Sequence, residues 1–262
     1  MRRVKPIPFT AESTRAINQG RKTQTRRVMT PEPDPMWLMV HAWRLRAPMH
    51  VCNDGRLYEG LKANGEPLAG LPSMVAPYAV GDLLWVREPW YCDDYRIPER
   101  GPLPSRLPPE VHPRDFVYRA DGEARVHFPE SEDIDSFRWR NPRFAPRWAS
   151  RTTLEVLEVR VQRVQEITEA DAIAEGIETD RPRADHPLWY LGGPHRVKGK
   201  GAKVFYEART AYADLWDHLN AKRGYSWISN PWIYAYTFRI FEHCCIRHRC
   251  GEQHHAVKSV GV

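Results

Sequence analysis

The longest alternation of apolar and polar side chains lies between Thr152 and Val164. Because successive side chains of a β-strand point to opposite faces, this pattern predicts a long strand with one buried face. One step of the alternation is irregular, which indicates a β-bulge. The apolar members are Leu154, Val156, Val159, Val161 and Val164.

Three further segments have the pattern of strands. Trp232 to Ile240 alternates aromatic or aliphatic side chains with smaller or polar ones, and Leu83 to Arg87 is a short apolar run that follows a Gly-Asp turn. Val4 to Phe9 predicts a short first strand. Pro6 and Pro8 lack a backbone N–H, so we expect this strand at the edge of a sheet.

Helices are predicted where caps flank a suitable pattern. Thr10 is a typical N-cap for a helix over Ala11 to Gln19, and Gly20 follows where a helix C′ glycine belongs. Thr168, with Asp171 three residues later, predicts a second helix over Glu169 to Glu175 that stops at Gly176. A third helix is predicted over Val204 to Asn220, with an apolar stripe along one side.

Two stretches, about 29–80 and 93–146, are rich in proline and glycine and predict irregular insertions. Within the second, Asp121-Gly122 between Phe116–Tyr118 and Ala124–Phe128 predicts a hairpin. The element order contains runs of strands with few helices. We therefore expect an α+β fold, a mostly antiparallel sheet closed into a β-barrel with flanking helices. Residues 1–242 would form this single domain, and 243–262 a flexible tail.

Composition narrows the partners. The 262 residues carry a net charge of +6 with a pI of about 9.1, which favours an anionic partner such as nucleic acid or a nucleotide, and ten tryptophans offer flat surfaces for bases. No apolar stretch is long enough to span a bilayer, and the basic N-terminus is not followed by the apolar run of a secretion signal. Five cysteines do not suggest a disulfide framework. We expect a cytoplasmic protein without a membrane partner.

The most reactive grouping lies in the basic segment from Gly20 to Arg27. Lys22 is crowded by three arginines, which disfavours its ammonium form, and a neutral lysine can act as a general base for a hydroxyl such as that of Thr25. The two side chains share a site only if the chain turns, which Gly20 allows. The residues alone favour a simpler hypothesis, a basic turn that holds phosphate.

The spacing Gly20-x-Lys22-x-x-Thr25-x-Arg27 resembles the signature of the ASCH domain, with threonine at the acidic position. The string Gly-Arg-Lys-Thr-x-Thr-x-Arg is similar to that of the small bacterial N4-acetylcytidine amidohydrolases. That resemblance implies catalytic roles for Lys22, Thr25 and Glu175, the glutamate late in the helix that begins Ile-Thr-Glu. It also implies a PUA-like fold and no metal or other cofactor.

The whole chain resembles the larger ASCH-like proteins of bacteriophages and prophages. The shared motifs are the opening Gly-Arg-Lys-Thr-x-Thr-Arg-Arg, the strand Gly81 to Glu88, and the segment Tyr225 to Phe238 with its Tyr-Ser-Trp and Asn-Pro-Trp motifs. The resemblance covers most of residues 4 to 241. The amidohydrolases are less than half as long, so the insertions could cover or reshape the pocket.

Further candidates lie near the expected site. We expect substrate contacts from Gly20, Arg27, Glu88, Trp90, Asn230 and Trp232. Glu88 could accept from a cytosine-type amine; the alternative is a buried ion pair with an arginine of the basic segment. Trp232 could stack on a base, or simply pack in the core. Cys245-x-x-His248 with Cys250 could bind zinc, although a flexible extension fits the spacing better.

Two functions from different classes follow. The first is an amidohydrolase that removes an acyl group from the exocyclic amine of a modified cytosine nucleoside. The second is a non-catalytic RNA- or DNA-binding module that recognises a modified base, with a ribonuclease as a variant that no cluster of metal-binding carboxylates supports. The partner is a modified nucleoside or nucleic acid in either case.

Overall fold

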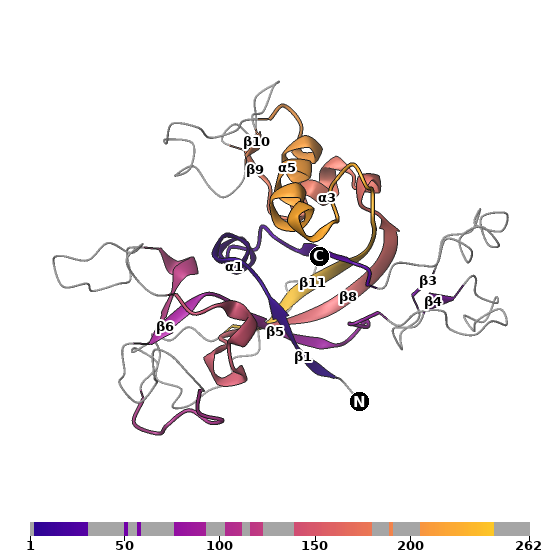
Figure 1. Cartoon of the computed structure of the whole chain (residues 1–262). Coiled ribbons are helices and arrows are strands. Elements are labelled where there is room, and N and C mark those ends of the chain that lie inside the picture. Colours follow the sequence, from indigo (N-terminus) through magenta and orange to yellow (C-terminus); the bar gives the residue numbers. More distant parts are fainter. Residues whose placement is uncertain are drawn as a thin grey trace, which may run out of the picture.

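The computed structural model describes residues 3–30, 50–51, 57–58, 76–92, 103–111, 116–122, 139–179, 189–190 and 205–243. Its centre is a five-stranded sheet (Figure 1). In spatial order the strands are β1 (Val4–Pro8), β5 (Leu83–Arg87), β8 (Thr152–Arg163), β11 (Trp232–His243) and β2 (Gln24–Val28). Only the β1–β5 pair is parallel, so the expected α+β class with a mostly antiparallel sheet is confirmed.

The sheet is not closed into a barrel in the described part of the chain, so that expectation was wrong. The two edge strands are β1 and β2, and a side chain links them: the Arg27 Nη2 donates to the Pro8 carbonyl at 2.6 Å. Pro6 and Pro8 explain why no backbone ladder replaces this link. Both residues lack the N–H that a ladder on the outer edge of β1 would need.

The long strands form where the alternation predicted them. β8 and β11 pair along almost their whole length, with register shifts between Thr237 and Phe238 and between Ile240 and Glu242. The first shift lies opposite the irregular step in β8, because Thr237 pairs with Glu158 and Phe238 with Val156. Two residues on one strand then oppose one on the other, which is the geometry of a bulge.

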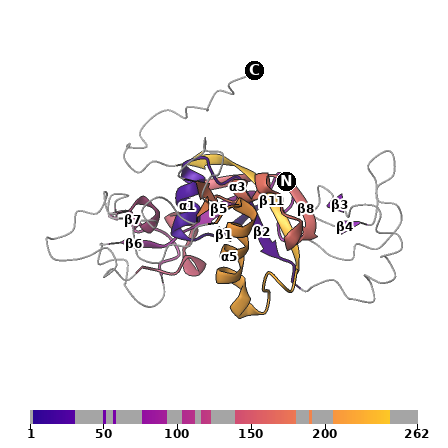
Figure 2. The same cartoon turned by 90° about the horizontal axis from the view of Figure 1, so that it is seen from above.

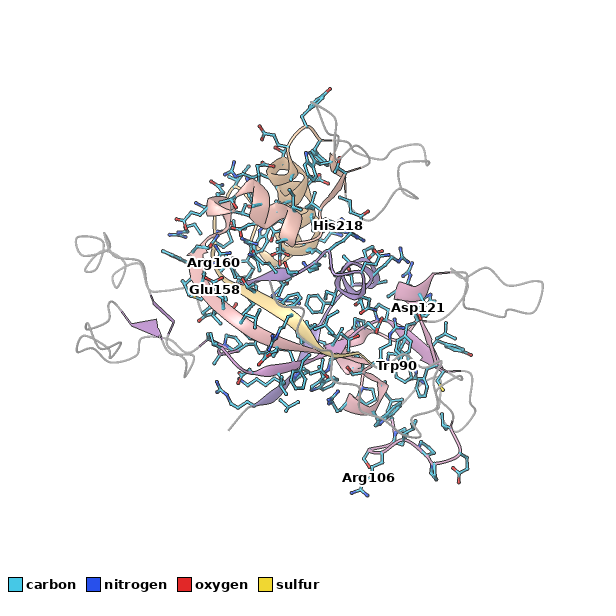
Figure 3. All side chains as sticks on the ribbon, turned by 180° about the vertical axis from the view of Figure 1, so that it is seen from behind. Trp90, Arg106, Asp121, Glu158, Arg160 and His218 are labelled. Carbon is cyan, nitrogen blue, oxygen red and sulfur yellow. The ribbon has the colours of Figure 1, made fainter. Side chains whose placement is uncertain are left out.

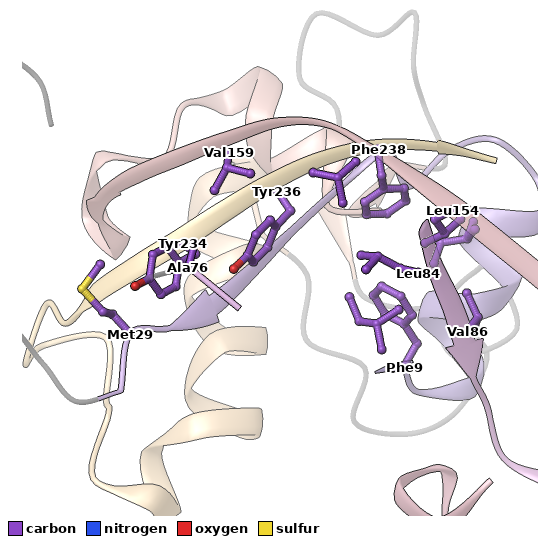
Figure 4. Packing of buried hydrophobic residues seen from close by; sticks show 13 residues of the cluster. Phe9, Met29, Ala76, Leu84, Val86, Leu154, Val159, Tyr234, Tyr236 and Phe238 are labelled. Atoms are coloured by element: carbon purple, nitrogen blue, oxygen red, sulfur yellow. The ribbon is translucent and has the colours of Figure 1, made fainter. Parts of the chain in front are cut away.

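The alternation also separates two hydrophobic cores. Tyr234, Tyr236 and Phe238 of β11 point to the first core, where Figure 4 shows them in a row opposite Leu84 and Phe9. Ile233 and Ala235 point to the opposite face of the sheet, where the second core lies under two helices. This division decides which side chains of β2 reach which environment.

In the described part of the chain, three α-helices pack around the sheet (Figure 1). α1 (Ala11–Asn18) follows β1 and buries Ile17 in the first core. α3 (Glu169–Ala174) and α5 (Ala208–Asn220) cover the second core, to which Ala172 and Trp216 contribute. Short 3-10 turns cap several connections: η2 (Arg119–Asp121), η5 (Pro142–Phe144), η6 (Arg147–Ala149), η7 (Val164–Glu166) and η8 (Ala221–Arg223). In the part that the structure describes, no helix has the length and apolar character needed to cross a membrane.

The insertions contain smaller elements. A pair of strands, β6 (Trp90–Cys92) and β7 (Phe116–Tyr118), lies at one end of the sheet, and the pair β3 (His50–Val51) and β4 (Leu57–Tyr58) lies at the other (Figure 2). A third pair, β9 (Glu178–Thr179) and β10 (Trp189–Tyr190), follows α3. β7 therefore pairs with β6; its expected partner, 124–128, lies outside the described residues, as does the tail from 244.

Both ends of the first predicted insertion, about 29–80, are packed against the sheet. Met29 and Ala76 are buried in the first core, and the Tyr78 hydroxyl donates to the Pro6 carbonyl at 2.8 Å. The many prolines and glycines between about 29 and 80 predicted an irregular insertion. They did not indicate that its two ends pack against the sheet. Such packing depends on distant partners and leaves no local periodicity.

Candidate functional site

The turn after α1 places Lys22. Gly20 has a φ of +73°, and its N–H donates to the Ile17 carbonyl at 2.8 Å while the Arg21 N–H reaches the Ala16 carbonyl at 2.9 Å. This is the left-handed helix end that favours glycine. The Lys22 N–H also donates to Ala16, at 3.1 Å. The helix end thus fixes the backbone of Lys22 before β2 begins.

A second glycine, Gly176, lies at the end of α3 and allows this helix to approach the turn that carries Lys22. Glu175 is the C-cap residue of α3. At the other end of the helix, Thr168 is the N-cap, and its side chain accepts from the Asp171 N–H at 3.1 Å as the sequence predicted. Gly176 follows with a φ of +95°. A Cβ atom added there would lie 3.3 Å from the Cβ atoms of Ala16 and Lys22. Only glycine lets α3 approach the turn this closely.

Lys22 and Glu175 are in direct contact although they are far apart in the sequence. The Lys22 Nζ donates to Glu175 Oε2 at 2.5 Å and to the Glu175 carbonyl at 2.7 Å. Each side chain is 4% exposed. The Thr23 N–H adds a backbone bond to the Ala174 carbonyl at 2.9 Å. The end of α3 is therefore joined to the start of β2 by both main chain and charge.

Arg26 joins Glu175 to a second carboxylate. Its Nη1 lies 3.1 Å from Glu175 Oε1, and its Nη2 lies 3.0 Å from Asp171 Oδ2. Arg160 of β8 holds the other oxygen of Asp171 at 3.0 Å. The sequence assigned Asp171 only to the helix cap, and Arg26 only to the cluster of arginines that crowds Lys22. The alternation along β2, which sends Arg26 to the α3 side, was the available signal.

Tyr212 of α5 is the other residue that sequence reasoning missed. It was assigned to the apolar stripe of the helix, and it does line the second core. Burial, together with the charge of Glu175, also raises the pKa of its hydroxyl well above the usual value. The Arg26 guanidinium lies 5.8 Å from the centre of the Tyr212 ring. Glu175 is thus contacted by an amine and a guanidinium, and its charge acts on a phenol.

The surroundings of Lys22 shift the pKa of its amine in opposing directions. Burial lowers the pKa of Lys22; the contact with Glu175 opposes that shift, and the charges of Arg27 and Arg26 add to it. The net direction is downward from the ordinary value of 10.5. A lysine with a lowered pKa can accept a proton, which is the property that a general base needs.

Thr25 and Arg27 point to the other side of β2. Thr25 pairs with Tyr236, and Arg26 pairs with Ala235. Because directly opposed residues share a face, Thr25 lies on the side of the first core. Thr25 is buried. Among the described residues, its hydroxyl makes no hydrogen bond to the Lys22 amine, which donates to two oxygens of Glu175. The structure brings Lys22 and Glu175 together, but it does not place Thr25 in contact with them.

Glu88 and Trp90 belong to a different cluster. The Arg151 Nε and Nη2 donate to the two carboxylate oxygens of Glu88 at 2.8 and 3.1 Å. The ion pair is therefore made with Arg151 and not with an arginine of the basic segment. Trp90 is fully buried in a third core under β6 and β7. Figure 3 shows Trp90 and Asp121 on the opposite side of the molecule from Arg160, which contacts the Lys22 network through Asp171.

Asn230 and Trp232 have structural contacts. Asn230 has a φ of +46°; its side-chain oxygen accepts from the Gln165 N–H at 3.0 Å, and its carbonyl accepts from Arg163 at 2.9 Å. Trp232 packs against the first core, with the Arg163 guanidinium 4.4 Å from the centre of its ring. These contacts agree with core packing of Trp232.

No trio of metal-ligating side chains gathers within the described ranges. The cysteines and histidines of the tail, from Cys244 to His255, lie outside them.

Comparisons with known proteins add little. No family model and no curated protein matches the chain. Among solved structures, the crystal structure of protein EF3133 from Enterococcus faecalis V583, described with the family model DUF984, matches with 9% sequence identity. The alignment covers 98% of this chain and 87% of that chain, with a TM-score of 0.32. A likeness of this strength carries no argument about fold or function.

Proposed function

We propose that this chain is a PUA-like protein of the ASCH type and that it hydrolyses the acyl group from the exocyclic amine of a modified cytosine, as in N4-acetylcytidine. The observation that carries the proposal is the buried contact between Lys22 Nζ and Glu175 Oε2 at 2.5 Å. This contact joins Lys22 of the Gly20–Arg27 segment to Glu175 of α3, the two residues to which the resemblance assigns catalytic roles. Burial also lowers the pKa of the Lys22 amine. The cytoplasm, where nucleosides and RNA occur, is the expected location.

In the first step, neutral Lys22 takes the proton of the Thr25 hydroxyl, and the Thr25 oxygen attacks the acetyl carbonyl carbon. For this, the Lys22 amine must turn from Glu175 toward Thr25 when substrate binds. Arg27 lies on the same face of β2 as Thr25, and its positive charge would stabilise the oxyanion.

In the second step, the bond between the carbonyl carbon and N4 breaks. Lys22 returns its proton to N4, so cytidine leaves as a neutral amine and the acetyl group stays on Thr25 as an ester. Water then attacks the ester carbonyl carbon while Lys22 accepts a water proton. The bond from this carbon to the Thr25 oxygen breaks, Lys22 passes the proton to that oxygen, and acetic acid leaves and ionises to acetate. Glu175 holds the Lys22 amine in the resting site and stabilises its ammonium form between the proton transfers.

A second candidate function is a nucleic-acid-binding module without catalysis. The hydrogen bonds of the Lys22 amine to Glu175 are also what a structural ion pair between β2 and α3 would show. They therefore support a binding module as well as an enzyme. In that case Lys22, Arg26 and Glu175 stabilise the fold, and the net charge of +6 attracts the ligand.

The deciding experiment is incubation with N4-acetylcytidine, followed by chromatography of released cytidine. The variants are Lys22→Met, Thr25→Val and Glu175→Gln, which keep side-chain size and so limit packing losses. We expect turnover by the parent and losses of about 10²–10⁴-fold for each variant. Absence of turnover by the parent protein would exclude N4-acetylcytidine as a substrate. Turnover that all three variants retain would assign the ion pair to structure alone.

A further inference from the structure

Four arginines around the ends of β1 and β5 have no carboxylate within ion-pair distance in the described part of the chain. They are Arg27, Arg87, Arg143 and Arg147. We call these four residues, with Trp85 and Phe144, the arginine band. Arg26 and Arg151, by contrast, are each neutralised by two carboxylates. The positive charge of the arginine band is therefore available to an external anion.

Contacts show that the arginine band is continuous. Pro8 receives the Arg27 hydrogen bond at its carbonyl and is the register partner of Arg87. Arg87 donates to the Arg143 carbonyl at 2.7 Å. The guanidinium groups of Arg87 and Arg147 lie 4.5 and 6.0 Å from the centre of the Trp85 ring. The Nε atoms of Arg27 and Arg87 are buried and have no hydrogen-bond acceptor in the described structure.

The outer end of the arginine band also offers an aromatic surface. Phe144 of η5 is 72% exposed, between the exposed residues Arg143 and Arg147. An exposed ring between cations is suited to a base that stacks while its phosphate contacts the arginines. Trp85 is covered by the guanidinium groups and holds them in place instead.

The inner end of the arginine band reaches the face of β2 that carries Thr25. Arg27 and Thr25 are two residues apart in this strand, and they pair with Tyr234 and Tyr236, which both line the first core. Arg27 is therefore shared between the proposed site and the band. A ligand chain along the band would have one of its units beside Thr25, the residue that Lys22 activates in the proposed mechanism.

We propose that the arginine band binds the sugar-phosphate backbone of a single-stranded nucleic acid, so that the acylated cytosine is presented to Lys22 as part of a polymer. The inference rests on the proposed function for the identity of the base. A single strand is required because the N4 amine of cytosine lies on the pairing edge, which a duplex conceals. The repeated negative charge of a strand matches a row of unpaired arginines better than one nucleoside does.

The test compares the full chain with the double variant Arg143→Gln/Arg147→Gln. Both residues are exposed, so the fold tolerates the change. The matched control is Arg209→Gln/Arg223→Gln, which removes the same charge from two exposed arginines that also lie over aromatic rings, at the two ends of α5. Fluorescence anisotropy measures binding of labelled 12-nucleotide RNA, DNA and a duplex over a range of salt concentrations.

For the single strands we expect the Kd of the band variant to rise about tenfold at 0.1 M salt, and the salt slope to fall by about 1.4, which is 0.7 for each lost phosphate contact. The control variant should change the Kd less than twofold. Equal effects of the two variants, or equally tight binding of heparin, would overturn the proposal. Tighter binding of the duplex than of the single strands would overturn it as well.

A kinetic arm separates this proposal from the proposed function. The ratio of kcat/KM for an oligonucleotide containing N4-acetylcytidine to that for the free nucleoside should fall about tenfold in the band variant. An unchanged ratio would show that the polymer does not follow the arginine band during turnover. If neither substrate is hydrolysed by the parent while the binding difference persists, the proposed function and the presentation of the base fail, and the nucleic-acid surface stands.

Discussion

The amine of Lys22 and the carboxylate of Glu175, 153 positions apart in the chain, meet at 2.5 Å in a buried contact between β2 and α3. Arg26 and Tyr212 act on the same carboxylate. Glu175 is therefore the centre of the network, and its charge decides how far burial lowers the pKa of Lys22.

Glu175→Gln should lower activity and move its pH dependence. If Lys22 is the base, kcat/KM rises with pH as Lys22 loses its proton, at a pH below the ordinary lysine value of 10.5 because burial lowers its pKa. Glutamine keeps the shape but removes the charge that raises this pKa. The acid limb of the pH profile should therefore shift to lower pH, with kcat reduced about 10²–10⁴-fold.

The control for that variant is Glu178→Gln. Glu178 pairs with Arg21 in the same segment, at 2.5 Å, but neither side chain is fully buried and neither contacts Lys22 in the described structure. It should leave the pH profile in place. A profile that Glu175→Gln does not move would contradict the electrostatic coupling of the two residues.

Arg26→Met should destabilise the fold by about 3–5 kcal/mol, because it leaves the buried carboxylate of Glu175 and that of Asp171 without their shared cation. Arg239→Met is the comparison. Arg239 is 64% exposed in its ion pair with Glu155, and such pairs contribute at most about 1 kcal/mol. Urea unfolding followed by tryptophan fluorescence measures both. Equal losses for the two variants would show that the Arg26 bridge is not a buried ion network.

Gly176→Ala and Gly20→Ala should differ although both glycines have a positive φ. The conformational penalty is about 1–2 kcal/mol in each case. At Gly20 nothing lies within 4 Å of the added Cβ, whereas at Gly176 the Cβ meets those of Ala16 and Lys22 at 3.3 Å. Overpacking should add about 1–3 kcal/mol for Gly176→Ala alone. Thermal unfolding and turnover, measured together, check whether the displacement of Lys22 also lowers kcat.

Stability should fall in alkali because of the tyrosines in the first core. Burial raises the pKa of Tyr234 to about 12, while an unfolded tyrosine titrates near its ordinary value of 10.0. The stabilisation is fully present below pH 10 and is lost as the pH rises toward 12, because only the unfolded state then releases the proton.

Tyr234→Phe should remove on the order of 1–2 kcal/mol of this pH dependence between pH 9 and 11.5. Tyr206→Phe, at a residue that is 81% exposed, should leave the dependence unchanged. Guanidinium unfolding at a series of pH values gives both slopes. Parallel slopes for the two variants would contradict burial of the Tyr234 hydroxyl.

The sequence by itself determined the features that depend on neighbouring residues. The alternation from Thr152 to Val164 specified β8 and its bulge, Thr168 specified the start of α3, and Gly20 specified the end of α1. Each follows from the geometry of a few consecutive residues, such as period-2 burial or a side chain that caps the next turn. The motif also singled out Lys22 and Glu175, although only through a resemblance.

Tertiary structure alone decided which charges meet. The packing of β2, β5, β8 and α5 brings distant side chains together. It pairs Glu88 with Arg151, turns Arg26 toward Glu175, and places the Tyr212 hydroxyl near a carboxylate. Tertiary structure also decided that the sheet stays open between its edge strands β1 and β2. The Arg27 side chain links these two strands, and no ladder of backbone hydrogen bonds joins them in the described structure. Contacts between residues a hundred positions apart are set by packing, which local periodicity does not encode.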